Sequence, residues 1–285
     1  MSSHPPTLLP RLKKLGLAPR KGLGQHFLTD PNILDAIVAA ADLPPDAVVI
    51  EVGPGPGVLT AALIPVTGRL IAIELDNRLA PLLAELYEDW PHVHVIQGDA
   101  LAISPNQALA QSGGVAPYYV LGNIPYYITS PLLRHFLEAE PRPERMVFTI
   151  QQDVAKRIAA HPPKMSLLAV SVQAYARPSI VRKLPPGAFT PPPKVHSAVL
   201  RLDALPQPLI PPHLRNNFFR VVRAGFGQKR KTLRNSLAGG LGLPAALTGV
   251  AISAAGLNPK QRAQELSIPQ WLRLTDEIKR LEGHR

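Results

Sequence analysis

Three features that could bind one ligand stand at the ends of three successive apolar runs. A glycine-rich loop at residues 53–57 follows the first run, Glu74 ends the second, and Asp99 follows the third. The carboxyl ends of parallel strands meet at one edge of an open α/β sheet, and such sheets bind their ligands there. Each acid alone could be a solvated residue at a strand end, but the three features together predict a binding site.

The spacing of the glycines indicates which ligand the loop would bind. The loop reads EVGPGPG at residues 51–57. It differs from the dinucleotide-binding fingerprint, because Val58 stands three residues after the second glycine. An acid two residues before the first glycine, with glycines at alternate positions, is typical of a loop that binds S-adenosylmethionine (SAM). Glu74 would then accept hydrogen bonds from the ribose hydroxyls, and Asp99 from the adenine amino group.

A fourth strand end carries residues that could hold a methyl acceptor. Asn123-Ile124-Pro125-Tyr126 follows the apolar run 118–121. The amino nitrogen of adenine is a poor nucleophile because its lone pair is delocalised into the ring. An Asn amide oxygen and a nearby backbone carbonyl that hold the NH₂ group would assist its attack by positioning and electrostatics. Tyr126 could stack on the base, which is worth about 1–3 kcal/mol, or it could be a plain core residue after a common Asn-Xaa-Pro turn.

A second aromatic candidate, Phe189, precedes three prolines at residues 191–193. Consecutive prolines form a stiff, extended segment. This segment could hold Phe189 over the other face of a base, with Lys194 near a phosphate. It could equally be a rigid loop that keeps Phe189 in the core, and the residues alone leave both interpretations open.

Strands and helices must alternate along the chain to position these residues. Apolar runs predict the strands, and one-sided apolar patterns with capping residues predict helices such as the one that starts at Asp30 and Pro31. This βαβαβ order predicts a doubly wound, parallel α/β sheet. The predicted strands span residues 47–52, 70–75, 92–97, 118–121, 146–151 and 195–202.

The composition divides the chain into three parts. Residues 1–21 contain five basic residues, four prolines and no acids, which predicts a flexible basic arm. Four prolines between residues 206 and 212 mark a linker, and the pattern after it is helical. We therefore expect a catalytic domain at residues 22–205 and a helical C-terminal domain at residues 206–285.

The composition also excludes several classes of protein. The 285 residues include no cysteine, which excludes a disulfide scaffold, a cysteine zinc site, an iron–sulfur cluster and a cysteine nucleophile. His92 and His94 share a strand face without a third ligand nearby, so no metal is expected. No apolar run approaches the roughly 18 residues of a membrane span, and residues 1–22 lack the apolar stretch of a secretory signal. We expect a cytoplasmic protein that does not bind membranes.

The net charge of +11 is distributed unevenly. Residues 25–149 contain five basic and fourteen acidic residues, whereas the segments on both sides are strongly basic. Lys and Arg side chains that neutralise phosphates release counterions, so this pattern indicates a polyanionic partner. An ordinary charged surface is the alternative.

Together these motifs resemble those of the ribosomal RNA adenine N6-dimethyltransferases of the small subunit, over about residues 21–237. The resemblance implies a Rossmann-like class I SAM-dependent methyltransferase domain with a small all-α C-terminal domain. It also implies transfer of two methyl groups to each of two adjacent adenines near the 3′ end of small-subunit (16S) rRNA, in ribosome biogenesis. The motifs are GLGQHFL at 22–28, EVGPGPG at 51–57, Glu74, Asp99, Asn123 to Tyr126, FTPPPKVHS at 189–197 and QKRKTLRNSL at 228–237.

The resemblance also implies roles for single residues, with the protein acting as a monomer on a pre-30S particle. Position 26 departs from the family, which often has Asn there, although a His can still donate to the SAM carboxylate. The residues that would hold SAM are His26, Leu28, Gly53, Glu74, Asp99 and Asn123. Those that would orient and stack the target base are Asn123, Tyr126 and Phe189. Those that would grip RNA phosphates are Lys229, Arg230, Lys231 and Arg234.

Three other functions share parts of this pattern. The first is a large-subunit rRNA adenine dimethyltransferase of the macrolide-resistance type, against which the basic segment 228–237 favours the small-subunit enzyme. The second is a non-catalytic rRNA-binding assembly factor, which the intact candidate SAM residues argue against. The third is a DNA adenine methylase, which often carries an acid at the position of Asn123.

Overall fold

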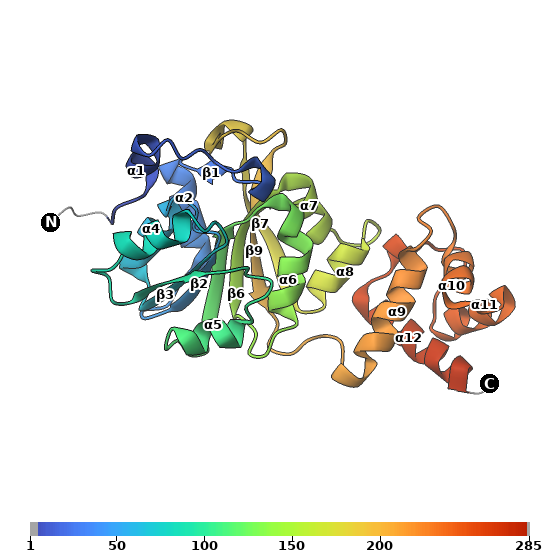
Figure 1. The fold of residues 1–285 in the computed structure, drawn as a ribbon. Helices are drawn as coiled ribbons and strands as arrows, with labels where there is room; N and C mark the ends of the chain where they lie inside the picture. The colour runs from blue at the N-terminus through green and yellow to red at the C-terminus, as the bar shows by residue number, and fades with distance from the viewer. Residues whose placement is uncertain (1–4, 284–285) are drawn as a thin grey trace. The chain divides into compact units, whose positions relative to one another are not determined.

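Seven strands form one sheet in the computed structural model, which describes residues 5–283 (Figure 1). In order across the sheet, the strands are β4 (Val93–Gln97), β3 (Arg69–Glu74), β2 (Val48–Val52), β5 (Tyr118–Asn123), β6 (Arg145–Gln151), β9 (Ser197–Ala204) and β7 (Ala176–Leu184). The strands from β4 to β6 are parallel, and β9 runs antiparallel to β6. The predicted class, a doubly wound α/β sheet, is confirmed.

The chain reverses the direction in which it adds strands at β2. It forms β3 and β4 on one side of β2, and then β5 and β6 on the other side. Such a switch point leaves a crevice at the carboxyl ends of the two central strands, where open α/β sheets bind ligands. Gly122 lets β5 approach β2 closely there, because a Cβ at this position would lie 2.5 Å from the carbonyl oxygen of Val52.

Both faces of the sheet are buried. Val49, Leu70 and Leu121 belong to the hydrophobic cluster on one face. Ile50 and Ile71 are their neighbours along the strands, point to the opposite face, and are just as buried. Burial on both faces explains why the strands appear in the sequence as near-continuous apolar runs.

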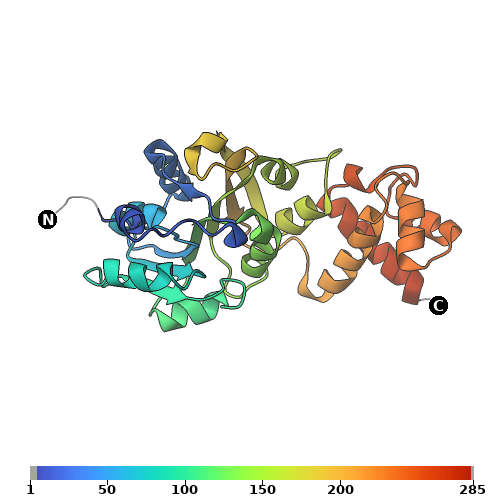
Figure 2. The same ribbon diagram turned by 45° about the horizontal axis from the view of Figure 1, so that its top comes forward.

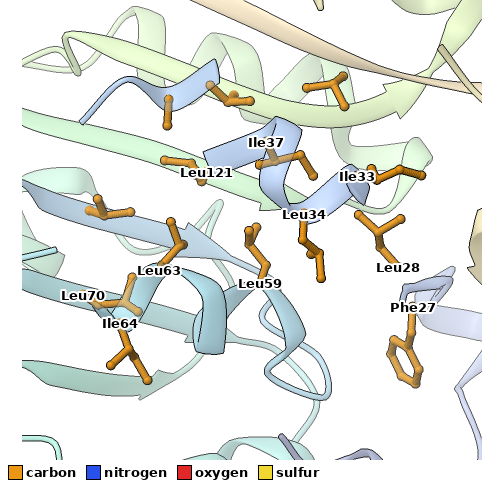
Figure 3. Close-up of a cluster of buried hydrophobic side chains, with 14 of the residues drawn as sticks. Phe27, Leu28, Ile33, Leu34, Ile37, Leu59, Leu63, Ile64, Leu70 and Leu121 are labelled. Atoms are coloured by element: carbon orange, nitrogen blue, oxygen red, sulfur yellow. The ribbon is translucent and has the colours of Figure 1, made fainter. Parts of the chain in front are cut away.

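Helices cover the sheet on both sides (Figures 1 and 2). Figure 3 shows how Ile33, Leu34 and Ile37 gather with Leu59 and Leu63 in the cluster on one face. The helix that carries the first three begins as predicted, with the Asp30 side chain accepting a hydrogen bond from the backbone at the N-cap. The helices here are α1 (Leu9–Lys14), α2 (Pro31–Ala41), α3 (Val58–Leu63), α4 (Leu79–Leu86), α5 (Pro105–Gln111) and α6 (Thr129–Leu137).

The sequence patterns did not predict the edge strand β7 or the short ladder outside the main sheet. The edge strand β7 is largely exposed, including its charged residues Arg177 and Arg182, so it lacks the apolar run that marks the central strands. A separate two-residue ladder joins β1 (Phe27–Leu28) to β8 (Phe189–Thr190). The predicted strands agree with the observed ones to within two residues at each end.

The N-terminal segment corrects the expectation of a flexible basic arm at residues 1–21. From residue 5 onward it is packed on the sheet unit, with α1 in its middle and Leu8 and Leu12 buried in the hydrophobic cluster. Residues 1–4 of the predicted arm lie outside the described part of the chain. The basic composition suggested an exposed segment, whereas Leu8 and Leu12 pack it into the core.

Hydrogen bonds tie this segment to the glycine-rich loop. The backbone N–H of Leu8 donates to the carbonyl oxygen of Pro56 at 2.8 Å. The hydroxyl of Tyr87 lies 2.9 Å from the carbonyl oxygen of Pro6 and 3.1 Å from that of Gly57. The segment therefore supports the loop from outside the pocket.

The chain divides into two units, and the division differs from the predicted domains. One unit comprises the chain up to Ala155 and Arg177–Ala204, and the other comprises Lys156–Ala176 and the chain from Leu205 onward. The predicted catalytic domain at 22–205 thus includes a stretch that belongs to the helical unit.

Contacts within the helical unit explain this difference. The backbone N–H of Met165 donates to the carbonyl oxygen of Gln264 at 2.9 Å, and that of Leu205 donates to Tyr175 at 2.8 Å. The guanidinium of Arg215 lies 5.8 Å from the centre of the Tyr175 ring. These partners are far apart in sequence, so local composition does not reveal them.

A buried tryptophan organises the helical unit. The Trp271 ring lies 5.6 Å from the Phe226 ring, and any side chain at Gly225 would clash with it. No helix among residues 5–283 is long and apolar enough to cross a membrane. The helices are α8 (Leu167–Gln173), α9 (Arg215–Phe226), α10 (Leu233–Leu241), α11 (Ala245–Ala254) and α12 (Ile268–Gly283), and α7 (Gln152–Ile158) spans the boundary between the units.

Candidate active site

A pocket opens at the carboxyl ends of β2, β3 and β5, with an empty volume of about 1220 Å³ that includes solvent at its mouth. This is the switch point of the sheet. Seven of the predicted residues line it: His26, Leu28, Gly53, Glu74, Asp99, Asn123 and Tyr126. Tertiary structure thus brings residues from four strand ends and the N-terminal segment into one site.

The glycine loop takes a backbone shape that its glycines permit. Gly53 and Gly55 have φ values of +68° and +56°, in the left-handed region that other residues avoid. A Cβ at Gly53 would meet nothing within 4 Å, so the loop leaves open space there. At Gly55 the backbone N–H donates to the Glu74 carboxylate at 2.8 Å. The loop therefore forms a cradle and also fixes the acid beside it.

The Glu74 carboxylate is held by two backbone donors. Its second oxygen accepts from the N–H of Asp76 at 2.7 Å. Burial raises the pKa of Glu74, while the N–H groups of Asp76 and Gly55 oppose that rise. Each carboxylate oxygen can accept a further hydrogen bond, so Glu74 can still bind a pair of hydroxyl groups.

Asp76 braces this corner of the pocket. Its buried carboxylate receives hydrogen bonds from the Arg78 guanidinium at 2.6 and 3.0 Å and from the Gln25 amide at 3.2 Å, and it pairs with Arg20 at 3.1 Å. Burial opposes ionisation, but the Arg78 and Gln25 hydrogen bonds outweigh it and lower the pKa of Asp76 to about 2. The sequence motifs did not single out Asp76, although an Asp-Asn-Arg turn after a strand-end acid signals such a brace.

Asp99 and apolar side chains form the wall where a planar ring could lie. Asp99 is exposed, and its Oδ1 accepts from the N–H of Leu101 at 2.8 Å. Leu75 and Ile124 also line the pocket, and Leu75 is 47% exposed. Sequence reasoning missed Leu75. An apolar residue directly after a strand-end acid is the signal that could have identified it.

Glu51 was predicted as part of the SAM motif, but the sequence assigned it no contact of its own. It lines the pocket but is only 1% exposed, and its Oε2 has no hydrogen-bond partner among the described residues. Burial raises the pKa of Glu51 to about 8, and the charge of Glu74 acts in the same direction. Hydrogen bonding by Thr60 opposes this rise. A buried carboxyl group with one unpartnered oxygen at a pocket wall suits a ligand that brings positive charge.

Asn123 has its amide oriented by a backbone group. Its Nδ2 donates to the carbonyl oxygen of His26 at 2.7 Å. This contact leaves the amide oxygen as the group available to an amino group that enters the pocket. The imidazole of His26 is also engaged, because its Nδ1 lies 2.7 Å from the carbonyl oxygen of Pro191, which can only accept. Nδ1 is therefore unavailable to a SAM carboxylate. The hydrogen bond that we expect from His26 to that carboxylate would have to come from an N–H at Nε2.

Tyr126 is held through its hydroxyl group and through one face of its ring. Its hydroxyl is 2.6 Å from the hydroxyl of Ser197, and its ring is stacked with the His26 ring at a centroid distance of 6.0 Å and an angle of 19°. Burial raises the pKa of Tyr126, against the hydrogen bond with Ser197. The ring is thereby fixed beside Asn123, as the prediction of a base-stacking residue requires.

Phe189 corrects one prediction. It is 2% exposed, belongs to the hydrophobic cluster, and pairs with Leu28 in the ladder of β1 and β8. It does not line the pocket. Of the two interpretations of the proline segment, the structure supports the rigid loop that keeps Phe189 in the core.

The predicted phosphate-binding residues lie in the helical unit. All four are exposed, in the loop that joins α9 to α10 and in the first turn of α10. They are Lys229, Arg230, Lys231 and Arg234. Among the described residues, no group of three or more His, Cys, Asp or Glu side chains could hold a metal ion.

These groups fit SAM. The open space at Gly53 accommodates a ligand against the loop, Glu74 suits ribose hydroxyls, and the orphaned Glu51 oxygen suits a cation. SAM carries a sulfonium and an ammonium group, an adenine and a ribose. A doubly wound sheet with this pocket at its switch point defines a Rossmann-like class I SAM-dependent methyltransferase, with a helical C-terminal part.

Comparison with known proteins identifies the family. Residues 16–280 match the family described as ribosomal RNA adenine dimethylase. A ribosomal RNA small subunit methyltransferase A from Dehalococcoides mccartyi is 44% identical over 94% of this chain and 93% of its own length. One from Pelotomaculum thermopropionicum is 39% identical over 94% of each chain. The protein belongs to the ribosomal RNA adenine dimethylase family, is a methyltransferase and uses SAM as methyl donor, as its sequence motifs indicated.

Solved structures agree with this assignment. The 23S rRNA methyltransferase ErmE superposes with a TM-score of 0.70 at 29% identity, over 89% of this chain and 99% of that one. A dimethyladenosine transferase from Plasmodium falciparum superposes with a TM-score of 0.75 at 25% identity, over 90% of this chain and 98% of that one. The match in both cases extends over both units of the chain.

Proposed function

We propose that the protein transfers two methyl groups to the N6 atoms of each of two adjacent adenines near the 3′ end of small-subunit rRNA. The observation that carries the proposal is the geometry of Asn123, whose Nδ2 is fixed by the His26 carbonyl so that its oxygen is free to accept from an adenine amino group. The curated relatives at 38–45% identity are named small subunit methyltransferase A, which favours this subunit.

The residues would divide the work as follows. SAM supplies a methyl group that its sulfonium already activates. Glu74 would hold the ribose hydroxyls, Asp99 the adenine amino group of SAM, and Gly53 the backbone contact. Asn123 would hold the amino group of the target adenine and so favour a nitrogen geometry in which its lone pair is available, with Tyr126 stacked on the base.

The substrate in the cell would be a pre-30S particle bound by a monomer in the cytoplasm. A net charge of +11 supports an RNA partner, and the exposed Lys and Arg side chains between α9 and α10 would contact phosphates.

The test is methylation of purified ribosomal subunits. The protein is incubated with labelled SAM and separated undermethylated small or large subunits, and the product is located by mass. Dimethyladenine in a 3′ loop of the small-subunit rRNA is the expected result. Label in the large subunit alone would assign the protein to the large-subunit reaction instead, the class of the 23S rRNA methyltransferase ErmE. No label in either, with SAM bound, would overturn the proposal in favour of a non-catalytic role.

A further inference from the structure

Tyr127 is an exposed aromatic ring at the pocket. It lines the same pocket as Asn123 and Tyr126, yet it is 61% exposed. Among the large apolar side chains that are exposed in residues 5–283, it is the one aromatic ring. A single exposed apolar side chain is ordinary on a protein surface, but this ring also lines a ligand pocket, where its open face can stack on a substrate.

The backbone at Gly24 supports this ring. Tyr127 lies in the short 3₁₀ turn Tyr126–Ile128, directly after the Asn-Ile-Pro-Tyr motif. A Cβ on Gly24 would lie 3.5 Å from the ring of Tyr127 and 3.4 Å from Pro125, and Gly24 has a φ of +62°. The ring therefore rests near the glycine backbone without a side chain over it, and most of its surface remains open to solvent.

The two neighbouring tyrosines are held differently. The ring of Tyr126 is fixed by Ser197 and stacked with His26, and burial of Phe189 removes the other predicted stacking ring. One ring is thus held within the pocket, and the other lines the pocket but is mostly open to solvent. The proposed substrate presents two adjacent bases, of which one must enter the pocket while the other stays outside.

We propose that Tyr127 is a stacking platform for the nucleobase that adjoins the target adenine in the RNA. The inference rests on the proposed function, because it requires an RNA substrate. Stacking on an aromatic ring accepts any base, so the contact contributes affinity and alignment of the strand and makes no sequence-specific demand. Tyr127 is a positioning residue, since the base that it would contact is not the one that reacts.

The first experiment compares Tyr127→Ala with Tyr127→Phe on undermethylated small subunits. Loss of one stacked base costs roughly 1–3 kcal/mol, which is roughly 5- to 150-fold in affinity. Tyr127→Ala should therefore raise KM for the subunit about tenfold, with kcat and the Kd for SAM within about twofold. Tyr127→Phe should behave as the unaltered protein, because it keeps the ring. Val115→Ala, at a more exposed side chain away from the pocket, is the matched control and should change nothing.

The second experiment removes the partner base. Small subunits are reconstituted with rRNA in which one adenine of the target pair is an abasic site, so that the other adenine remains as the target. The abasic site should raise KM about tenfold for the unaltered protein and have little further effect with Tyr127→Ala.

The outcomes separate this inference from the proposed function. Equal KM values for Tyr127→Ala and the unaltered protein would overturn the inference. It would also be overturned if the abasic site raised KM by the same factor in Tyr127→Ala as in the unaltered protein. A loss of SAM affinity or of Tm in Tyr127→Ala would overturn it in favour of a structural role. Failure of the unaltered protein to label small subunits would instead overturn the proposed function.

Discussion

The two halves of the pocket are built in different ways. The cofactor half extends from the glycine loop to Asp99 and contains the buried carboxyl groups of Glu51 and Glu74. Backbone N–H groups donate hydrogen bonds that fix the Glu74 carboxylate. The acceptor half contains Asn123, Tyr126 and the exposed Tyr127, with no acidic side chain.

This difference matches the charges of the two substrates. A small cation gains from buried carboxylates, and a preformed site limits the ordering cost of binding it. A base on an RNA strand arrives with phosphates, which carboxylates would repel, so neutral hydrogen-bonding and stacking groups suit it better. The comparison predicts that variants in one half change binding of one substrate and leave the other largely unaffected.

The largest expected effect comes from Asn123→Ala in the acceptor half. Removing a preorganised hydrogen-bonding group at a reacting centre costs roughly 10²- to 10³-fold in kcat. We expect this loss in methylation of undermethylated small subunits, with the circular dichroism spectrum and Tm preserved. A calorimetric Kd for SAM should change less than tenfold. Rates equal to those of the unaltered protein would break the argument from the acceptor site.

The next effect comes from the basic loop of the helical unit. Reversing the charge at Lys229, Arg230, Lys231 and Arg234 together should lower RNA affinity on the order of 100-fold at low salt and flatten the plot of log K against log salt. SAM affinity should be unchanged, because the site for SAM lies in the other unit. The measurement is a salt titration of subunit binding, and loss of SAM binding in a folded variant would contradict this division.

Glu74→Gln tests the cofactor half. A glutamine NH₂ group would face one of the N–H donors from Gly55 or Asp76, so the fixed acceptor for ribose hydroxyls would be lost. Hydrogen bonds to a charged group contribute about 1.5–3 kcal/mol, so SAM affinity should fall roughly 10- to 100-fold. KM for the subunit at saturating SAM should stay within about twofold. A change confined to the subunit KM would reverse the assignment of the two halves.

The smallest effect is on stability and concerns Glu51. Its pKa is raised from 4.5 to about 8 in the folded protein, so between these values the folded state holds more protons than the unfolded chain. Stability therefore falls as the pH rises from about 5 to about 8. Glu51→Gln removes this titration and should raise Tm by several degrees at pH 8 and by almost nothing at pH 5.

Thermal melts at a series of pH values measure this difference. The same variant should bind SAM more weakly at pH 8, because the ionised acid that faces a cationic ligand is gone. An equal Tm gain at both pH values would exclude titration as the cause.

The sequence by itself determined where six of the sheet strands lie along the chain, and the chemistry of their ends. Continuous apolar runs specify strands that are buried on both faces, and the spacing in EVGPGPG distinguishes a SAM loop from a dinucleotide fingerprint. Glu74, Asp99 and Asn123 follow from the same rule, because parallel strands bring their carboxyl ends to one edge. These features are encoded locally, within a few residues of each site.

Only the tertiary structure decided which aromatic ring is buried and which segments belong together. Phe189 precedes a proline-rich segment, and Tyr127 follows a proline-containing motif. Phe189 is nevertheless in the core, whereas Tyr127 is exposed. The basic N-terminal segment is anchored by Leu8, and residues 156–176 join the helical unit. The physical reason is the same in each case: burial depends on which distant segment packs against a side chain, and local periodicity carries no information about that partner.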